Sequence, residues 1–322
     1  MNIRIVSRAE ILSLITMSDA IDAMARAFGQ LSAGSAEMPV RVALATGGGI
    51  SLFMPARLGG VGERGAKVVS VFGENRARGL PGINGVILML DDETGLPVAL
   101  MDGGELTAIR TAAAAGLAAR LLSRSDSRVL AIFGAGVQAP RQIEAMRTVR
   151  PIEEVRVVSR GGDSARRLAS SLKGVGARAV SDPAEAVDGA DIIVAVTTSG
   201  TPVFEGSALP AGTHVSGSGS FMPHMREVGG EVVTRARVVV EEREAALEEA
   251  GDLVIPVGEG LVTTDVIDAD LGEIVNGDAP GGNAGRELTF FKSVGTAVQD
   301  VAIGAEVLRR AEAAGVGRVV GL

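Results

Sequence analysis

Hydrophobic and polar positions divide the chain into three regions with different periodicities. The first opens with an amphipathic helical pattern over 11–33, in which Ser18 and Asp19 offer a start for a second segment, and continues with alternating apolar and polar residues. From 104 to 124 the pattern is helical and rich in alanine, which predicts a long connecting helix. After residue 128, short apolar runs alternate with helical segments.

The alternating pattern of the first region predicts an open sheet with few helices. Its expected strands are 40–44, 50–54, 66–72, 86–90 and 97–101. The glycines at 47–49 would form the turn between the first two strands, and the residues at 91–95 would form the turn between the last two.

The third region predicts parallel strands joined by helices, which is typical of a doubly wound α/β domain. Its expected strands are 128–133, 154–158, 177–180, 190–196, 213–216 and 237–240, and its clearest helices are 138–149 and 163–173. The tail from Phe290 to Ala314 is expected to be helical and to return to the first domain.

A glycine-rich turn follows the first of these parallel strands and reads Gly134-Ala-Gly-Val-Gln-Ala139. Gly134 allows a sharp turn, Gly136 lets the backbone approach phosphates, and Ala139 lets the helix pack closely on the strand. Val137 and Gln138 then open a helix whose free N–H groups attract a pyrophosphate. Because the chain has 44 glycines, the motif alone is weak. The strand before it and the helix after it favour a dinucleotide site over a purely structural turn.

The strand over 154–158 ends at Ser159 and Arg160, and no acidic residue appears before Asp163. A site that prefers NAD usually places a carboxylate here to bind the ribose 2′-hydroxyl. An arginine beside a hydroxyl suits a 2′-phosphate instead, because a guanidinium binds phosphate oxygens in a bidentate way. We therefore expect NADPH as cofactor, with NADH as the alternative and a solvated surface arginine as the other reading of Arg160.

Composition excludes several other classes. The net charge of −8, with no basic stripe, argues against a nucleic-acid partner. The absence of cysteine excludes disulfides and thiolate chemistry, and His214 and His224, the two histidines, do not have metal-ligand spacing. No apolar run is long enough to span a bilayer, and charges interrupt the N-terminus early. We expect a cytoplasmic protein with two domains, no metal and no membrane partner.

Lysine is rare in this chain, with only three among 31 basic residues: Lys67, Lys173 and Lys292. Lys67 lies in an apolar strand, where loss of hydration would lower its pKa toward values useful for acid–base chemistry. The alternative is a strand lysine whose ammonium reaches solvent. For Lys292 we expect only a structural role at the start of the tail helix.

Several segments in the same order resemble the ornithine cyclodeaminase/mu-crystallin family. They are Met38–Arg41, Gly65–Ser70, Asn75 with Gly79–Gly82, Leu106–Ala113, the glycine motif and Phe291–Asp300. The resemblance implies a Rossmann-type nucleotide-binding domain over 119–290. It also implies a substrate-binding and homodimerisation domain built from 1–118 and 291–322, with an open mixed sheet.

The resemblance also implies roles for particular residues. Arg41 and Arg110 would hold the substrate carboxylate, and Lys67 would lie beside the reacting carbon. Thr111, Thr197 and the glycine turn would contact the cofactor, and Ser293 and Gly295 would line the substrate pocket. Independently of the resemblance, a carboxylate in a closed site needs compensating charge, which two arginines supply. Surface salt bridges are the alternative for both arginines.

The chain departs from the cyclodeaminase pattern at two acidic positions. Leu52 stands where cyclodeaminases carry a glutamate, two residues before Met54. Phe221 stands in place of an aspartate and Met225 in place of a lysine, in the segment that includes His224. Apolar side chains at Leu52 and Phe221 would favour neutral substrates, which makes cyclodeamination of ornithine a weaker expectation.

Together these features predict NADPH-dependent reduction of a small imino acid, such as the cyclic Δ1-pyrroline-2-carboxylate, with the arginines orienting its C=N carbon for hydride transfer. Lys67 would donate a proton or stabilise charge. The alternatives are an ornithine cyclodeaminase or alanine-type dehydrogenase and, from another class, a crystallin-like protein that binds NADPH without catalysis.

Overall fold

The computed structural model describes residues 2–59 and 63–321, so positions 1, 60–62 and 322 of the predicted domains lie outside the described residues. Its contacts group the chain into two compact units, Met1–Arg110 with Thr296–Leu322 and, separately, Thr111–Gly295. The first unit thus joins both ends of the chain. The functional division into substrate and nucleotide domains stays a prediction.

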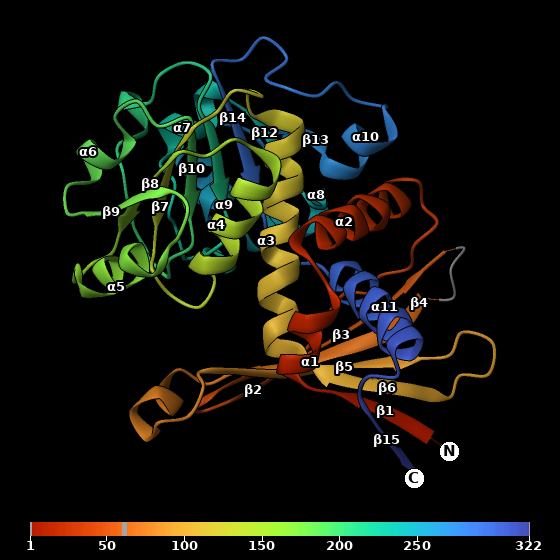
Figure 1. Ribbon diagram of the computed structural model, residues 1–322. Helices are drawn as coiled ribbons and strands as arrows, with labels where there is room; N and C mark the ends of the chain where they lie inside the picture. The colour runs from red at the N-terminus through yellow and green to blue at the C-terminus, as the bar shows by residue number, and fades with distance from the viewer. Residues whose placement is uncertain (1, 60–62, 322) are drawn as a thin grey trace. The chain divides into compact units, whose positions relative to one another are not determined.

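The first unit contains a mixed sheet in which the described residues form seven strands, in the order β15-β1-β6-β5-β4-β3-β2 (Figure 1). The β1–β6 pair is parallel and the other pairs are antiparallel. The strands are β1 (Asn2–Val6), β2 (Val42–Thr46), β3 (Gly49–Leu58), β4 (Glu63–Val71), β5 (Ile83–Leu90), β6 (Pro97–Asp102) and β15 (Arg318–Gly321).

Helices α2 (Met17–Ser32) and α11 (Ala297–Ala314) lie side by side, and both contact the mixed sheet (Figure 1). α11 approaches β5 closely because Gly304 has no side chain: a Cβ there would lie 2.8 Å from the sulfur of Met89. α1 (Arg8–Leu14) and the 3₁₀ helix η1 (Gly73–Arg78) complete this unit. α3 (Gly103–Leu122) begins in it and continues into the second unit.

The second unit contains a parallel sheet whose described residues form eight strands, in the order β13-β12-β14-β11-β10-β7-β8-β9. The strands are β7 (Val129–Phe133), β8 (Glu154–Val158), β9 (Gly176–Val180), β10 (Ile192–Ala195), β11 (His214–Gly217), β12 (Ala236–Val240), β13 (Ile267–Asp270) and β14 (Leu288–Lys292). The strand order reverses between β7 and β10, as in doubly wound sheets. The predicted fold class, a Rossmann-type parallel sheet plus an open mixed sheet built from both termini, is confirmed.

Helices of the second unit connect its parallel strands. They are α4 (Ala139–Val149), α5 (Asp163–Ser171), α6 (Pro183–Val187), α7 (Gly230–Arg235), α8 (Arg243–Glu249), α9 (Gly251–Gly258) and α10 (Leu271–Asn276), with short 3₁₀ turns η2 (Gly206–Ala208) and η3 (Thr264–Val266). None of the helices described within 2–59 and 63–321 is long and apolar enough to cross a membrane.

The prediction of a helix from Phe290 onward was wrong, and Lys292 therefore does not lie at the start of a helix, although its contacts with Asp252 and Ser220 are structural as expected. Residues 288–292 form β14, between β11 and β12, and α11 begins only at Ala297. Phe290, Phe291 and Lys292 are fully buried. A parallel strand covered on both faces is a continuous apolar run, which periodicity alone does not separate from the start of a helix.

Smaller differences have local causes. The helix predicted over 11–33 is two helices, and the second begins after Thr16, whose hydroxyl accepts the N–H of Asp19 at 3.2 Å in a capping box. The strand expected at 40–44 lies two residues later, as β2. Strands β1, β13 and β15, which are short and lie at or next to a sheet edge, were not predicted.

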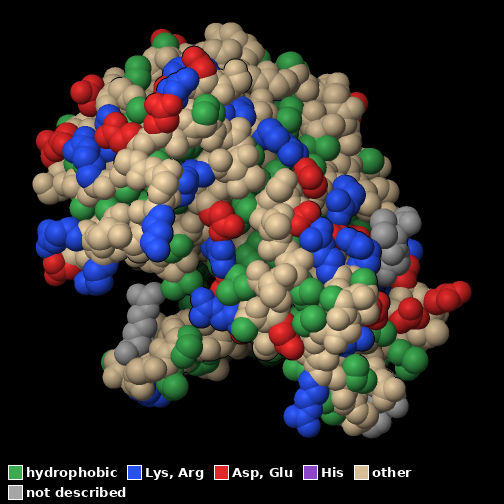
Figure 2. Space-filling view, viewed as in Figure 1, with side chains coloured by type: hydrophobic (Ala, Val, Ile, Leu, Met, Phe, Trp, Pro, Cys, Tyr) green, Lys and Arg blue, Asp and Glu red, His purple; other side chains and the backbone are tan. Residues whose placement is uncertain are grey.

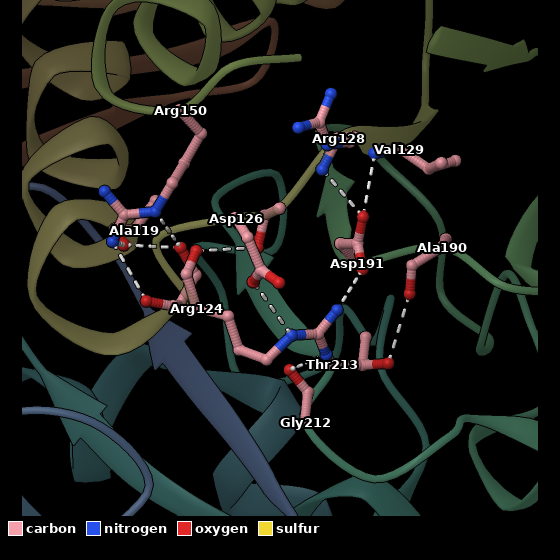
Figure 3. Close-up of polar contacts among 12 residues, drawn as sticks. Ala119, Arg124, Asp126, Arg128, Val129, Arg150, Ala190, Asp191, Gly212 and Thr213 are labelled. Carbon is pink, nitrogen blue, oxygen red and sulfur yellow. Dashed lines mark hydrogen bonds and ion pairs between the residues drawn. The ribbon is translucent and has the colours of Figure 1, made fainter. Parts of the chain in front are cut away.

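Polar contacts fix the amino ends of the parallel strands (Figure 3). Asp191, just before β10, accepts the N–H groups of Arg128 at 2.7 Å and Val129 at 2.9 Å. Arg150 donates to the carbonyls of Ala119 and Ser123 at 2.8 and 2.9 Å, and so ties the residue after α4 to the C-terminal end of α3. This edge of the sheet is therefore occupied by structural contacts.

Charges on the surface are mixed in sign. On the face seen in Figure 2, basic and acidic side chains of the second unit are interspersed. Many of them pair locally, as Arg178 does with both Glu154 and Glu185. This distribution gives a phosphate backbone no continuous basic track on that face.

Candidate functional site

Lys67 lies on the covered face of the mixed sheet. The antiparallel register places it directly opposite Met54 on β3 and Ile87 on β5, and both of these side chains are buried. Helix α11 packs on β3, β4 and β5. The Lys67 side chain is only 2% exposed, so its ammonium cannot be a surface group reaching for solvent.

Asp300 on α11 joins the two basic residues that the sequence singled out. Its carboxylate lies 2.6 Å from Nζ of Lys67 through one oxygen and 3.1 Å from Nε of Arg110 through the other. Asp300 is fully buried and Arg110 is nearly so. One carboxylate thus positions two cations that come from β4 and α3.

Gln299 fixes the outer part of the Arg110 guanidinium. Its side-chain oxygen accepts Nη1 of Arg110 at 2.8 Å and the backbone N–H of Thr296 at 2.8 Å. The second contact belongs to the capping box at the start of α11. The same glutamine therefore caps the helix and orients the arginine.

Burial lowers the pKa of the Lys67 ammonium from 10.5 to about 8. Asp300 opposes this shift, whereas the positive charges of Arg110 and Arg41 add to it. Because the folded pKa lies below the unfolded one, protonated Lys67 costs stability below about pH 8. That cost disappears as the pH rises from about 8 to 10.5.

The first unit brings several predicted site residues together. Arg41 acts on Lys67 through its charge, and it directly precedes β2 at the edge of the sheet. Leu52 lies on the same face of the sheet as Met54 and Lys67, because it pairs with Val69 on β4. A basic cluster of Arg41, Lys67 and Arg110 therefore lies in the same unit as the apolar side chains of Leu52 and Met54.

In the second unit, Gly134 forms the turn after β7 with φ +106, a conformation that favours glycine. A Cβ there would lie 2.6 Å from the carbonyl oxygen of Val196, so the turn presses against the end of β10. Among the described residues, no heavy atom comes within 4 Å of the place where a Cβ of Gly136 would lie. A side chain would therefore clash at Gly134, whereas the space beside Gly136 is open.

The start of α4 fits a bound anion. Gln138 is the N-cap but its side chain makes no capping hydrogen bond, and the first turn contains no acidic residue. The buried Oε1 of Gln138 has no hydrogen-bond partner among the described residues. Val137 is 80% exposed, and Ala139 is fully buried. These features suit a pyrophosphate held by the backbone N–H groups before Ala139, whose own N–H donates to the carbonyl of Gly136 at 3.2 Å.

The end of β8 carries no carboxylate at the predicted ribose position. The hydroxyl oxygen of Ser159 accepts the N–H of Ala165 at 3.1 Å and the hydroxyl of Ser164 at 2.9 Å, and so helps to fix α5. Arg160 is exposed and forms no ion pair with a carboxylate of the described residues. Its guanidinium is available to a ligand.

The other predicted cofactor residues lie in the same unit. Thr197 follows β10, and its N–H donates to the buried carboxylate of Glu227. Thr111 is buried on α3, next to Arg110 in sequence, but no contact described here places it at the glycine turn. Its cofactor role stays a prediction.

The predicted pocket residues of the second unit occupy two segments at the carboxyl edge of the sheet. Phe221 is half-buried and His224 is exposed, both on the segment after β11, where Met225 is buried. Ser293 donates its hydroxyl to Glu241 at 2.7 Å, and the N–H of Gly295 donates to the same carboxylate at 2.7 Å. Ser293 and Gly295 are therefore held by Glu241 after β14.

His214 has a structural environment. It is fully buried on β11, where its Nδ1 lies 2.8 Å from the hydroxyl of Thr289, and burial lowers its pKa to about 3. Within 2–59 and 63–321, no group of three or more histidine and acidic side chains could hold a metal ion.

Asp300 and Gln299 were not predicted as site residues from the sequence. Two signals were available. Thr296-Ala-Val-Gln299 fits the capping-box pattern, and Asp300 is a lone carboxylate in an otherwise apolar run. A buried carboxylate requires a cationic partner, and its partners come from distant parts of the chain.

Comparisons with known proteins find similarity over nearly the whole chain. The model of the ornithine cyclodeaminase/mu-crystallin family matches residues 1–315. Δ1-Pyrroline-2-carboxylate reductase of Bacillus cereus is 38% identical over 98% of this chain and 99% of its own length. The structure of that enzyme from Thermococcus litoralis, in complex with NADH and L-proline, has a TM-score of 0.94 at 37% identity, covering 98% of this chain and 99% of the other. An archaeal alanine dehydrogenase dimer with bound NAD has a TM-score of 0.94 at 33% identity, with full coverage of both chains.

Removing the Asp300 charge should move the Lys67 pKa further down. In Asp300→Asn, Lys67 loses the carboxylate that raises its pKa, while burial and Arg110 continue to lower it. Because the chain has three lysines, ¹³Cε-lysine NMR can follow each titration, with the Lys67 signal assigned from Lys67→Arg. Glu306→Gln, on the same helix, should leave that titration unchanged. An unaltered Lys67 pKa in Asp300→Asn would contradict the coupling.

Proposed function

The chain belongs to the ornithine cyclodeaminase/mu-crystallin family, and from that premise we propose that it reduces a small imino acid with a nicotinamide cofactor. The favoured substrate is a cyclic imine such as Δ1-pyrroline-2-carboxylate, and the product is the corresponding amino acid. The observation that carries the proposal is the pair of buried cations, Lys67 and Arg110, that share one carboxylate.

The charge balance around Lys67 favours a negatively charged ligand. Of the charged groups that act on this lysine, two are cations, Arg110 and Arg41, and one is the carboxylate of Asp300. A substrate carboxylate would offset the excess positive charge, and a guanidinium can bind it with two parallel hydrogen bonds. Arg41 and Arg110 would thus fix the position of the imine carbon.

Lys67 would supply the proton. When bound, the reduced nicotinamide supplies a hydride to the imine carbon. The imine nitrogen must then gain one proton, which the Lys67 ammonium can donate. A pKa of about 8 suits this task, because the group is protonated at neutral pH yet gives up its proton more readily than an ordinary lysine.

The cofactor would be held by the turn after β7 and the start of α4. Gly134 and Gly136 shape the backbone, the N–H groups of Val137 and Gln138 would bind the pyrophosphate, and buried Ala139 would let the start of α4 lie close to the turn. We infer a preference for NADPH from Ser159 and Arg160, since no carboxylate lies at the end of β8 to bind a 2′-hydroxyl.

The substrate pocket would be apolar at two positions. Leu52 shares the sheet face of Lys67, and Phe221 lies on the segment after β11, which also carries His224. Neither side chain can pair with the second amino group of a diamino acid or guide its departure. A neutral ring or short alkyl substituent therefore suits these positions better than the ammonium of ornithine.

Substrate assays test this proposal directly. The protein should oxidise NADPH with Δ1-pyrroline-2-carboxylate, more slowly with pyruvate plus an amine, and should not convert ornithine to proline and ammonia. The rate should fall as the pH rises through about 8, because Lys67 loses its proton. Lys67→Met should abolish reduction while NADPH still binds. Ornithine conversion without imine reduction would overturn the proposal.

The proposed preference for NADPH can be tested at Arg160. Arg160→Asp should lower the ratio of NADPH to NADH efficiency about tenfold or more, because the carboxylate repels a 2′-phosphate and accepts a 2′-hydroxyl. Arg166→Asp is the matched control, since Arg166 is an exposed arginine nearby that pairs with Asp163. Equal ratios in Arg160→Asp and the unmodified protein would remove Arg160 from the cofactor site.

We also propose that the chain forms a homodimer through the uncovered face of the mixed sheet. Val42, Phe53, Val68 and Val86 lie opposite one another across β2, β3, β4 and β5, on the face away from Lys67. Val42 and the nearby Leu44 are both 57% exposed. An apolar row of this kind is typical of an interface, and the similar alanine dehydrogenase is a dimer.

Charge placed in this row should weaken the dimer. Phe53→Glu combined with Val42→Glu should weaken self-association about 100-fold or more, because two buried carboxylates would face an apolar partner. Sedimentation velocity over a range of concentrations measures the effect. Leu261→Glu, at an apolar position 53% exposed in the other unit, is the control. A double variant that remains dimeric would place the interface elsewhere.

A further inference from the structure

The segment after β11 is tied to the segment after β10 by one buried carboxylate. Glu227 is fully buried, and its two oxygens accept three backbone N–H groups: that of Thr197, that of Gly219 at 2.7 Å and that of Ser220 at 2.8 Å. Thr197 belongs to the segment after β10, whereas Gly219 and Ser220 belong to the segment after β11. Glu227 therefore joins two neighbouring strand ends.

The two segments also meet through their backbones. A Cβ on Gly219 would lie 2.1 Å from the carbonyl oxygen of Thr197 and 2.4 Å from its nitrogen, so only glycine fits. The N–H of Arg226 donates to the carbonyl of Ser199 at 3.0 Å, and the N–H of Val203 donates to that of Glu227 at 3.0 Å. The segments thus form one hydrogen-bonded platform, which we define as residues 196–203 and 217–228.

A second layer of buried charge holds Glu227 itself. Asp252 accepts the backbone N–H groups of Glu227 and Val228 at 2.6 and 3.0 Å. Lys292 lies 2.8 Å from the other oxygen of Asp252 and donates to the carbonyl of Ser220 at 2.6 Å. Asp252, Glu227 and Lys292 are all fully buried.

Burying one cation and two carboxylates is expensive, and well-packed apolar side chains would stabilise a core at least as well. Charged groups differ from apolar ones because their hydrogen bonds are directional, so they specify a single arrangement of the backbone groups that they bind. Here those backbone groups all belong to the platform. The network therefore fixes the geometry of the platform more than it adds stability.

The position of the platform indicates what that geometry serves. In open parallel sheets, ligands bind at the carboxyl ends of the strands where the strand order reverses, which here is between β7 and β10. The glycine turn lies at the end of β7 and presses on Val196 of the platform. The adenosine side would extend over β8, so the opposite half of the dinucleotide extends over β10 and β11.

We propose that Glu227, supported by Asp252 and Lys292, is a positioning residue that preorganises the platform for the nicotinamide half of the cofactor. The proposal rests on the nicotinamide cofactor of the proposed function. Glu227 itself would touch neither substrate nor cofactor. It acts by holding the backbone of Thr197, Gly219 and Ser220.

Binding of whole and truncated ligands distinguishes positioning from general stability. In Glu227→Gln the affinity for NADPH should fall about tenfold or more, since the amide cannot accept three N–H groups. The affinity for 2′-phospho-ADP-ribose, which lacks nicotinamide, should stay within about twofold because its half of the site is untouched. Nicotinamide fluorescence gives the first Kd, and competition against NADPH gives the second. If the unmodified protein binds NADH more tightly than NADPH, the same comparison is made with NADH and ADP-ribose.

Glu231→Gln is the matched control. Glu231 also accepts a backbone N–H, that of Gly206 at 2.9 Å, but it lies on α7 outside the platform. Glu231→Gln should lower thermal stability, but it should not change the affinity for NADPH more than the affinity for 2′-phospho-ADP-ribose. Equal losses for both ligands in Glu227→Gln, or no loss for either, would overturn the inference.

Amide hydrogen exchange tests the same idea without a variant. In the ligand-free protein, the amides of Thr197, Gly219 and Ser220 should already be protected, because the carboxylate holds them before any cofactor binds. Free exchange that slows only on adding NADPH would contradict preorganisation. Failure of the unmodified protein to bind either dinucleotide would overturn the proposed function instead.

Discussion

The chemistry proposed for this protein depends on one buried carboxylate. Asp300 contacts Lys67 and Arg110, which are fixed on different elements and would repel one another without it. Because a single negative charge is shared between two cations, the cluster can accept a further anion. The same contact keeps the Lys67 pKa from falling below about 8. The proposed anchoring of a substrate carboxylate and the proposed supply of a proton would therefore both depend on Asp300.

Carboxylates also organise the parallel sheet. They differ from Asp300 because they bind backbone N–H groups, whereas Asp300 binds cationic side chains. Asp191 binds N–H groups before β7, Glu227 joins the segments after β10 and β11, and Glu241 holds the turn after β14. Each acidic side chain substitutes for hydrogen bonds that irregular backbone cannot make within the sheet. At the carboxyl ends of the strands, which would face a ligand, Glu227 and Glu241 thus shape the backbone but would not themselves touch that ligand.

The departures from the cyclodeaminase pattern gain meaning from this arrangement. Apolar Leu52 and Phe221 stand at the two positions where the cyclodeaminase pattern has acidic residues, whereas Asp300 keeps its ion pair with Lys67 and Glu227 keeps its hydrogen bonds to backbone N–H groups. Apolar side chains at the first two positions would change which substrate fits the proposed pocket without removing these contacts. Reduction of a neutral imine requires fewer charged partners than departure of an amine, which agrees with this division.

The local pattern of the sequence was sufficient to predict much of the structure. The glycine turn, the alternating strands and the class of fold could be predicted because each depends on neighbouring residues, and the unusual Lys67 could be recognised from its apolar strand. Three features could not be predicted in this way. They are the buried partner Asp300, the central strand that contains Lys292, and the hydrogen bonds by which Glu227 holds the platform. Their roles depend on contacts across long stretches of chain, for which periodicity carries no information. Only the tertiary structure decides which buried charges meet.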